Sequence, residues 1–175
     1  MRALPQPYAW LAAEPAPRML LEALKLYGTL EKPGSGDNPV ILKWAEELGL
    51  RDYNHDAIPW CGLFAAIISK RAGKPLAASP LWARSWADWG TKSPKAALGD
   101  ILVFSRNGGG HVALYVGEDD NYYHCLGGNQ GDAVSIVRIS KARCIAVRRF
   151  YSVGVPANVR PVKLAANGTP FTSEA

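Results

Sequence analysis

The first half of the chain carries apolar residues at the spacing of amphipathic helices. Residues 18–27 repeat apolar positions at intervals of three and four, and Gly28 follows as a helix stop. Asn38 has the side chain of an N-cap and Pro39 suits a first helical position, so a second helix is predicted over 39–48. The pattern therefore opens the domain with two helices joined by a loop rich in Gly and Pro.

A third helix is predicted over residues 61–72, and Gly73 ends it. Its apolar side chains cover a wide arc, so we expect it to be buried at the centre of the domain. Three tryptophans follow at spacings of four and three, near one face of a helical segment. Core packing is the favoured interpretation, and the alternative is that one of them lines a substrate site. They are Trp82, Trp86 and Trp89.

After residue 99 the periodicity changes from that of helices to that of strands. Short apolar segments alternate there with turns rich in Gly, Asn and Asp. These segments predict about five strands, at residues 100–105, 111–116, 122–126, 133–139 and 145–150. Because helices come first and a meander of strands follows, we expect an α+β fold with an antiparallel sheet packed against the central helix.

Length and composition fit one globular domain. The chain has 175 residues, of which 48% are hydrophobic and 20% are charged, as in ordinary folded domains. We predict an irregular segment over 1–14, a single domain over 15–150 and a loosely ordered tail over 151–175. No apolar run approaches the roughly 18 residues of a membrane-spanning helix. The proline-rich start is unlike a secretory signal peptide.

Charge and cysteine content exclude several classes of function. The 20 Lys and Arg residues outnumber the 15 Asp and Glu residues by five, which is compatible with an anionic polymer such as the bacterial cell wall. No nucleic-acid-binding motif is present. The three cysteines include no C-x-x-C pair and are too few for a disulfide framework. We therefore expect neither a metal nor another cofactor.

Cys61 is the candidate nucleophile. It is expected in the first turn of the buried helix, where partial positive charge and unsatisfied N–H groups favour a thiolate. The same N–H groups can serve as an oxyanion hole. The alternative is a small cysteine packed in the core, which is the favoured interpretation of Cys125 and Cys144.

A nucleophilic thiolate needs a base, and the chain has only three histidines. His111 follows three glycines and opens an apolar strand, so it is well placed to reach a site at the end of the sheet. His55 lies in a loop shortly before the candidate nucleophile. His124 lies inside a predicted strand, where a structural histidine is the commoner outcome.

A third group must hold the imidazole in one tautomer. If the turn between the second and third strands is symmetric about Asp119, Asn129 lies on the same face of the sheet as His111. His124 then pairs with Leu114 on the opposite face, and a shift by one residue reverses this preference. Asn129 is therefore preferred on geometry, with His124 as the alternative.

Four further residues are candidate substrate-binding or oxyanion groups. Tyr53 could donate a hydrogen bond to a substrate carbonyl, and surface packing is an equally good interpretation. Asp56 could cap the helix of the nucleophile or orient the substrate. The full set is Tyr53, Asp56, Trp60 and Gln130.

Four segments carry a family resemblance when taken in order. They read Gly-Ser-Gly-Asp-Asn-Pro at 34–39, Asp-Ala-Ile-Pro-Trp-Cys-Gly at 56–62, Gly-Asp-Ile-Leu-Val-Phe at 99–104 leading to Gly-His-Val-Ala-Leu-Tyr-Val-Gly at 110–117, and Leu-Gly-Gly-Asn-Gln-Gly-Asp-Ala-Val at 126–134. With them the sequence resembles the NlpC-like and CHAP-like group of papain-fold peptidoglycan cysteine peptidases, in a branch found in bacteria and their phages. The resemblance covers roughly residues 18–150.

The resemblance implies a papain-like fold and assigns roles to its site residues. It implies Cys61 as nucleophile, His111 as general base and acid, and Asn129, from the Leu-Gly-Gly-Asn-Gln motif, as third residue. The wider NlpC-like pattern often has a second histidine near the spacing of His124, which keeps that residue as the alternative. A cell-wall-binding module, which many relatives carry, and the Glu of the CHAP-like pattern have no counterpart here.

The expected function is hydrolysis of an amide bond in the peptide stem or cross-link of peptidoglycan, through a thioester acyl-enzyme. One alternative is a non-catalytic cell-wall-binding or phage tail component on a degenerate peptidase fold. Another is an acyltransferase that uses the same Cys-His pair.

We expect a monomer made in the cytoplasm that reaches the wall after lysis or dedicated export. A phage lysin, a virion-borne enzyme and an exported effector all fit this expectation. A holin or immunity partner is not identifiable from the residues.

Overall fold

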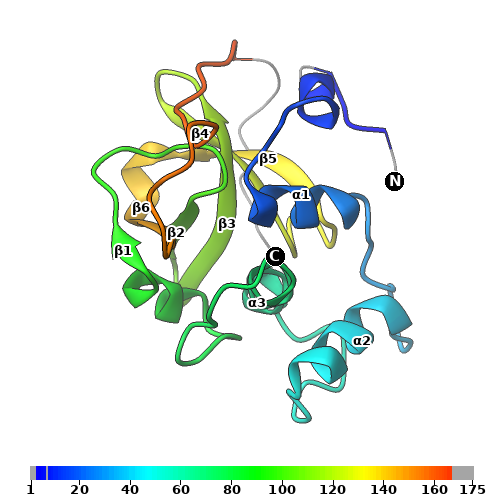
Figure 1. The fold of residues 1–175 in the computed structure, drawn as a ribbon. Coiled ribbons are helices and arrows are strands. Elements are labelled where there is room, and N and C mark those ends of the chain that lie inside the picture. The colour runs from blue at the N-terminus through cyan, green and yellow to red at the C-terminus, as the bar shows by residue number, and fades with distance from the viewer. Residues whose placement is uncertain (1–2, 7, 167–175) are drawn as a thin grey trace.

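The computed structural model describes residues 3–6 and 8–166. Helices lie on one side of a six-stranded antiparallel sheet, so the fold is α+β (Figure 1). The helices are α1 (Arg18–Lys25), α2 (Pro39–Leu48) and α3 (Cys61–Arg71), with short 3-10 helices at Ala9–Ala12, Ala83–Asp88 and Lys141–Arg143.

The predicted start and stop signals of α2 are confirmed. The side chain of Asn38 accepts a hydrogen bond from the N–H of Val40 at 2.8 Å, and Pro39 is the first helical residue. Gly49 ends the helix at φ +74°, a left-handed backbone conformation that favours glycine. Local side-chain chemistry therefore decides where this helix lies.

All five predicted strands are present, and one more joins them. The sheet contains β1 (Thr91–Lys92), β2 (Ile101–Arg106), β3 (Gly109–Glu118), β4 (Tyr122–Gly127), β5 (Ser135–Ser140) and β6 (Cys144–Arg149). The strand order is β1-β6-β2-β3-β4-β5, which differs from the predicted meander because β6 pairs with β2 rather than with β5. The two-residue β1 has no periodicity that a sequence pattern can reveal.

The position of β6 requires a strongly curved sheet. Only Lys141–Arg143 separates β5 from β6, and four Cα steps span at most about 15 Å. In a flat sheet the four strand spacings from β6 to β5 would take about 19 Å. The sheet therefore curls until its two sides approach each other, as Figure 1 shows.

The register of the β3–β4 hairpin corrects the symmetric turn expected from the sequence. His124 lies opposite Gly117 rather than Leu114, and a bulge shifts the register between Tyr115 and Gly117. The cause is Asp119, whose side chain accepts the N–H groups of the second and third residues after it, each at 3.0 Å. Asp119 is thus the first residue of the turn and not its centre.

The core surrounds α3, as predicted. Residues from Cys61 to Ser69 are all buried between the sheet and the other helices. Trp44 and Trp60 pack beside it, with ring centroids 6.1 Å apart. Of the later tryptophans, Trp86 and Trp89 are buried, whereas Trp82 is 74% exposed and faces solvent.

Both segments that flank the predicted domain touch it. Tyr8 and Leu11 are buried in the core, so the described part of segment 1–14 belongs to the domain. Near the other end, Lys163 forms an isolated parallel β-bridge with Glu118 of β3. Residues 167–175 of the predicted tail lie outside the described residues. None of the helices within the described ranges has the length and apolarity to cross a membrane.

Candidate active site

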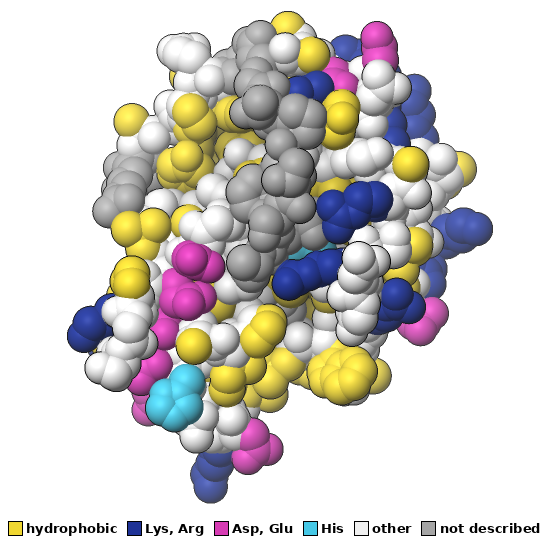
Figure 2. Space-filling model, turned by 180° about the vertical axis from the view of Figure 1, so that it is seen from behind, with side chains coloured by type: hydrophobic (Ala, Val, Ile, Leu, Met, Phe, Trp, Pro, Cys, Tyr) yellow, Lys and Arg dark blue, Asp and Glu magenta, His cyan; other side chains and the backbone are white. Residues whose placement is uncertain are grey.

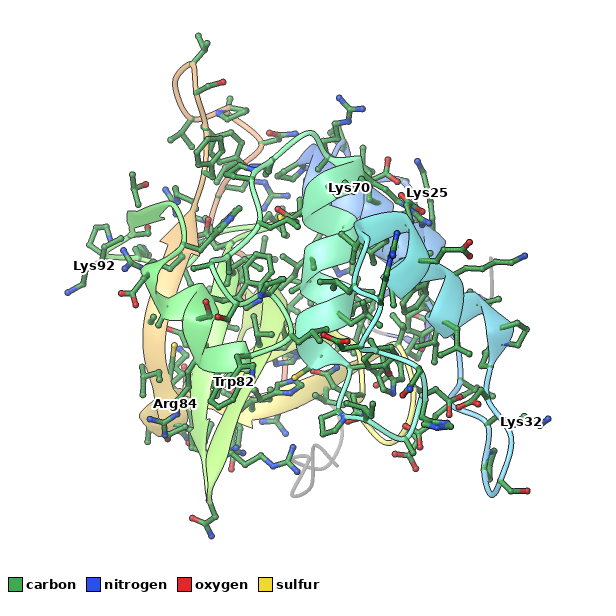
Figure 3. All side chains as sticks on the ribbon, turned by 90° about the horizontal axis from the view of Figure 1, so that it is seen from below. Lys25, Lys32, Lys70, Trp82, Arg84 and Lys92 are labelled. Atoms are coloured by element: carbon green, nitrogen blue, oxygen red, sulfur yellow. The ribbon has the colours of Figure 1, made fainter. Side chains whose placement is uncertain are left out.

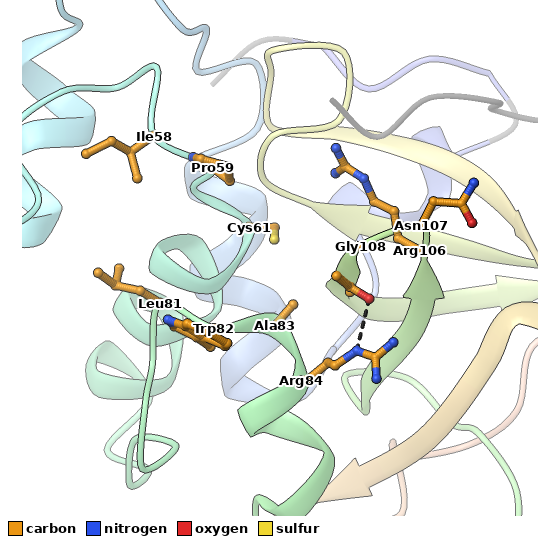
Figure 4. A pocket seen from close by; sticks show the side chains of 12 residues that line it. Ile58, Pro59, Cys61, Leu81, Trp82, Ala83, Arg84, Arg106, Asn107 and Gly108 are labelled. Carbon is orange, nitrogen blue, oxygen red and sulfur yellow. Dashed lines mark hydrogen bonds between the residues drawn. The ribbon is translucent and has the colours of Figure 1, made fainter.

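Cys61 is the first residue of α3 and is 94% buried, with 6% of its surface exposed. Pro59 and Trp60 precede it, and no side chain caps the helix. The first N–H groups of a helix have no acceptor within it, and they carry the positive end of the helix dipole. In Figure 4 the sulfur of Cys61 points into a groove between two walls.

Strand β3 supplies a backbone donor to this sulfur. The backbone N–H and C=O of Tyr115 bond Asp100 and Gly99, on the β2 side of the strand. Because the backbone groups of successive residues point to opposite sides, Val112, an odd number of positions away, directs its N–H toward the β4 side. The β3–β4 ladder runs only as far as Leu114 in that direction. The N–H of Val112 lies beyond the end of the ladder, where it favours the thiolate of Cys61 and lowers the pKa of that thiol.

His111 is the second group at the sulfur. Burial by itself raises the pKa of the Cys61 thiol, but the nearby His111 imidazole lowers it, as do the N–H groups of Val112 and Gly62. The net effect is a pKa below the ordinary value of a cysteine. The fold thus brings together two side chains that are fifty positions apart in the sequence.

Gln130 holds the other side of the imidazole. Its Oε1 lies 3.0 Å from Nε2 of His111, and both side chains are buried. The amide nitrogen of Gln130 donates to the carbonyls of Ser135, at 2.6 Å, and Cys125, at 3.2 Å. Because the nitrogen of the amide is occupied, its oxygen faces the ring, and Nε2 of His111 carries the proton. Nδ1 of the neutral ring is then the basic nitrogen.

The two residues predicted for the third position, Asn129 and His124, form hydrogen bonds with residues other than His111. Asn129 donates to Glu31 at 3.4 Å, and the same carboxylate oxygen accepts the indole N–H of Trp60 at 2.9 Å. His124 bonds Tyr8 at 2.6 Å through Nδ1 and Asp119 at 3.0 Å through Nε2. Both ring nitrogens of His124 are therefore engaged in the core.

The role of Gln130 has a signal in the sequence, which is the glycine at position 127. The alternation of side chains along β4 does not reveal this role. The strand ends at Gly127, and Asn129 adopts φ +57°, so the chain turns before strand alternation can continue. A Cβ atom on Gly127 would lie 2.6 Å from Oε1 of Gln130. Glycine at position 127 leaves the space into which the Gln130 side chain folds back.

Tyr53 and Asp56 organise the loops beside the site. The hydroxyl of Tyr53 donates to the carbonyl of Ile58 at 3.0 Å, and this tyrosine is 4% exposed. The carboxylate of Asp56 accepts the backbone N–H groups of Lys32 and Asn38 at 2.9 and 2.7 Å. Of the two roles considered for Asp56, capping of α3 is wrong, because its carboxylate holds the loop before α2 instead.

The groove beside Cys61 has a volume of about 600 Å³. One wall follows Pro80 and Leu81, whose carbonyls lie so close to α3 that a Cβ on Gly62 would clash with both. The other wall is the β2–β3 turn at residues 106–110. A shallow, open groove of this kind can admit an extended peptide to the sulfur.

Within residues 3–6 and 8–166, no group of three or more His, Cys, Asp and Glu side chains is arranged to hold a metal ion. Models of known protein families do not match the sequence, and no curated protein matches it.

Proposed function

We propose that the protein is a papain-like cysteine peptidase or amidase that cleaves an amide bond in the peptide part of peptidoglycan. The observation that carries the proposal is the thiol of Cys61 at a helix N-terminus, with a pKa held below its ordinary value by His111 and two backbone N–H groups. A cysteine that only fills space in a core needs none of these partners.

The first half of the reaction forms a thioester. Proton transfer from Cys61 to His111 gives a thiolate and an imidazolium, and the sulfur attacks the scissile carbonyl carbon. The N–H groups at the start of α3 face the oxygen on which negative charge develops. Collapse of the tetrahedral intermediate breaks the C–N bond, and His111 gives its proton to the leaving amine.

The second half releases the acid. His111, neutral again, takes a proton from water, and the hydroxide attacks the thioester carbonyl. Collapse expels the Cys61 thiolate and releases a carboxylic acid, which gives its proton to solvent and becomes a carboxylate. Gln130 does not touch substrate in this scheme; it acts as a positioning residue that fixes which nitrogen of His111 is basic.

Peptidoglycan is proposed as substrate on the strength of the sequence segments. The four motifs that resemble the NlpC-like and CHAP-like peptidases include Cys61, His111 and the Leu-Gly-Gly-Asn-Gln run that contains Gln130. The basic balance of the chain, with 20 Lys and Arg against 15 Asp and Glu, favours an anionic wall polymer.

Mass spectrometry of muropeptides tests this proposal. Purified peptidoglycan is incubated in ¹⁸O-water with the wild type, with Cys61→Ala and with Cys144→Ala, a control at a thiol outside the groove. The wild type and Cys144→Ala should release fragments whose new carboxyl carries ¹⁸O, and Cys61→Ala should release none.

Two other results have clear meanings in the same experiment. Full activity of Cys61→Ala contradicts the mechanism. Fragments that gain an amine instead of ¹⁸O identify a transferase rather than a hydrolase.

A further inference from the structure

The groove beside Cys61 is lined by both apolar and cationic side chains. Apolar side chains line one wall, and the most exposed of them is Trp82 at 74%. Two arginines line the groove as well, Arg84 from the 3-10 helix Ala83–Asp88 and Arg106 from the end of β2. Figure 4 shows Trp82 and Arg84 on the same segment, with the side chain of Arg84 reaching the β2–β3 turn.

Arg84 is held in place by the backbone. Its Nε donates to the carbonyl of Gly109 at 2.9 Å, the dashed line in Figure 4. Gly110 allows this approach, because a Cβ there would lie 2.9 Å from Cγ of Arg84. Anchoring one nitrogen of the fork orients the guanidinium and leaves its two terminal nitrogens as donors at the groove.

The charge of Arg84 has no acidic partner among the described residues. Several other arginines face a carboxylate, as Arg71 faces Glu47 and Arg149 faces Asp100. No Asp or Glu within residues 3–6 and 8–166 forms an ion pair with Arg84. A fixed guanidinium in a groove, without a carboxylate of its own, is suited to a carboxylate that arrives with a ligand.

The wider surface has the same asymmetry. Figure 2 shows most of the Lys and Arg side chains of the rear face on one half and a row of Asp and Glu on the other, with single charges of the opposite sign in each half. An exposed tryptophan beside a cationic group offers a flat apolar platform next to a charge. The ligand that fits has a carboxylate joined to small apolar groups.

We propose that Arg84 is a specificity-determining residue that binds a free carboxylate next to the scissile amide, with Trp82 as the apolar platform for the same part of the substrate. The inference rests on the proposed function, because it names the substrate class of that site. Peptide stems that are branched through side-chain carboxyl groups belong to this class, since each branch leaves a free α-carboxylate beside an amide.

Alkylation of Cys61 tests the groove without any peptidase activity. Second-order rates with iodoacetate and with iodoacetamide are measured by mass spectrometry of the Cys61 peptide, and their ratio is compared between proteins. The attraction of the His111 imidazolium for iodoacetate is common to all of them. We expect the ratio to fall about 3- to 10-fold in Arg84→Gln, because a charge-assisted contact is lost.

Two variants serve as matched controls in this experiment. Lys92→Gln removes a positive charge from β1, where Figure 3 shows the side chain pointing away from the protein, and it should keep the wild-type ratio. Arg84→Lys retains a charge at the groove and should give an intermediate ratio. Equal ratios in Arg84→Gln and Lys92→Gln would overturn the inference.

A peptide experiment separates this inference from the proposed function. Disaccharide-peptide muropeptides with free stem carboxylates are compared with the same molecules carrying carboxamides. The wild type should prefer the free acids by about 10-fold or more in kcat/KM, and Arg84→Gln should lose most of that preference. If neither form is cleaved, the result contradicts the proposed function. If both forms are cleaved equally well, that function stands and the role of Arg84 is contradicted.

Discussion

At the scale of single residues, the site depends on what surrounds one sulfur atom. Burial of Cys61 opposes ionisation and raises its pKa, whereas His111 and two backbone N–H groups favour the thiolate and lower the pKa below its ordinary value. The imidazole in turn depends on Gln130, whose amide is fixed by two carbonyl acceptors. The contact of His111 with Cys61 and that of Gln130 with His111 can each be removed by one substitution, so their effects on the reactivity of Cys61 can be measured separately.

The pH dependence of Cys61 alkylation reports the first contact. In the wild type, the iodoacetamide rate should rise with pH through a midpoint below the roughly 8.5 of a free cysteine, because the folded pKa is lowered. His111→Ala should move the midpoint above that value, since burial remains and its largest opposing partner is gone. A midpoint that does not move would show that the imidazole does not act on this thiol.

Replacement of Gln130 reports the second contact. We expect Gln130→Ala to lower kcat by about 10- to 100-fold and to shift the alkylation midpoint, because the His111 ring loses the acceptor that fixes its tautomer. Asn129→Ala is the comparison, since the sequence motif favours that residue. A larger loss and a larger midpoint shift in Asn129→Ala would assign the positioning role to Asn129.

At the scale of elements, α3 and the segment that follows it form one wall of the site. The carbonyls of Pro80 and Leu81 pack so closely on Gly62 that the helix and the wall cannot move independently. Glycine at this position is therefore a requirement of packing and not of backbone conformation. The start of the helix and the rim of the groove form a single unit.

Gly62→Ala should consequently destabilise the protein. Alanine normally stabilises an exposed helix by up to about 1 kcal/mol relative to glycine, but here a Cβ would lie 2.6 Å from the Pro80 carbonyl oxygen. We expect the free energy of unfolding to fall by about 1–3 kcal/mol, as for overpacked cores. Urea denaturation measures the change, and Lys70→Ala on the exposed end of the same helix should stay within about 0.5 kcal/mol. Unchanged or increased stability of Gly62→Ala would contradict the close packing.

At the scale of the whole molecule, a buried polar network attaches the N-terminal segment to the sheet. Tyr8 bonds His124, His124 bonds Asp119, and Arg138 donates to the same carboxylate at 2.8 Å. Burial by itself raises the pKa of Asp119, but hydrogen bonds from His124, Arg138 and two backbone N–H groups lower it to about 2. Burial lowers the pKa of His124, so this ring is held neutral.

Tyr8→Phe should destabilise the fold, because it leaves a buried nitrogen of His124 without its donor. We expect a loss of about 1–3 kcal/mol in urea denaturation at pH 7. Tyr151→Phe, at a half-buried ring near the other end of the domain, is the control and should lose less than about 0.5 kcal/mol. Equal effects of the two variants would mean that the Tyr8 hydroxyl bond contributes little.

The same network predicts acid sensitivity. A lowered pKa means that the unfolded state binds protons more tightly, so stability is fully present above the unfolded pKa and is lost as pH falls. For His124 this loss begins below the unfolded value of 6.5, and for Asp119 it runs from 3.8 toward about 2. Urea midpoints from pH 7 to pH 3 should decline in the wild type. His124→Gln should decline less between pH 7 and pH 5, and an identical slope in both proteins would contradict the role of His124.

Local sequence determined much of this protein. Helix and strand positions follow from periodicity, and Asn38 and Gly49 set the ends of α2 through their own side chains and backbone freedom. Cys61 at the start of a buried helix was predictable for the same reason, because the signal spans only a few neighbouring residues.

Only the tertiary structure decided which groups meet. The Asp119 turn and the bulge set the β3–β4 register, and the chain leaves β4 at Gly127, so Gln130 rather than Asn129 reaches His111. The pairing of β6 with β2 likewise depends on the curvature of the whole sheet. Such contacts join residues whose spacing along the chain carries no periodic signal, and one residue of register changes the partner.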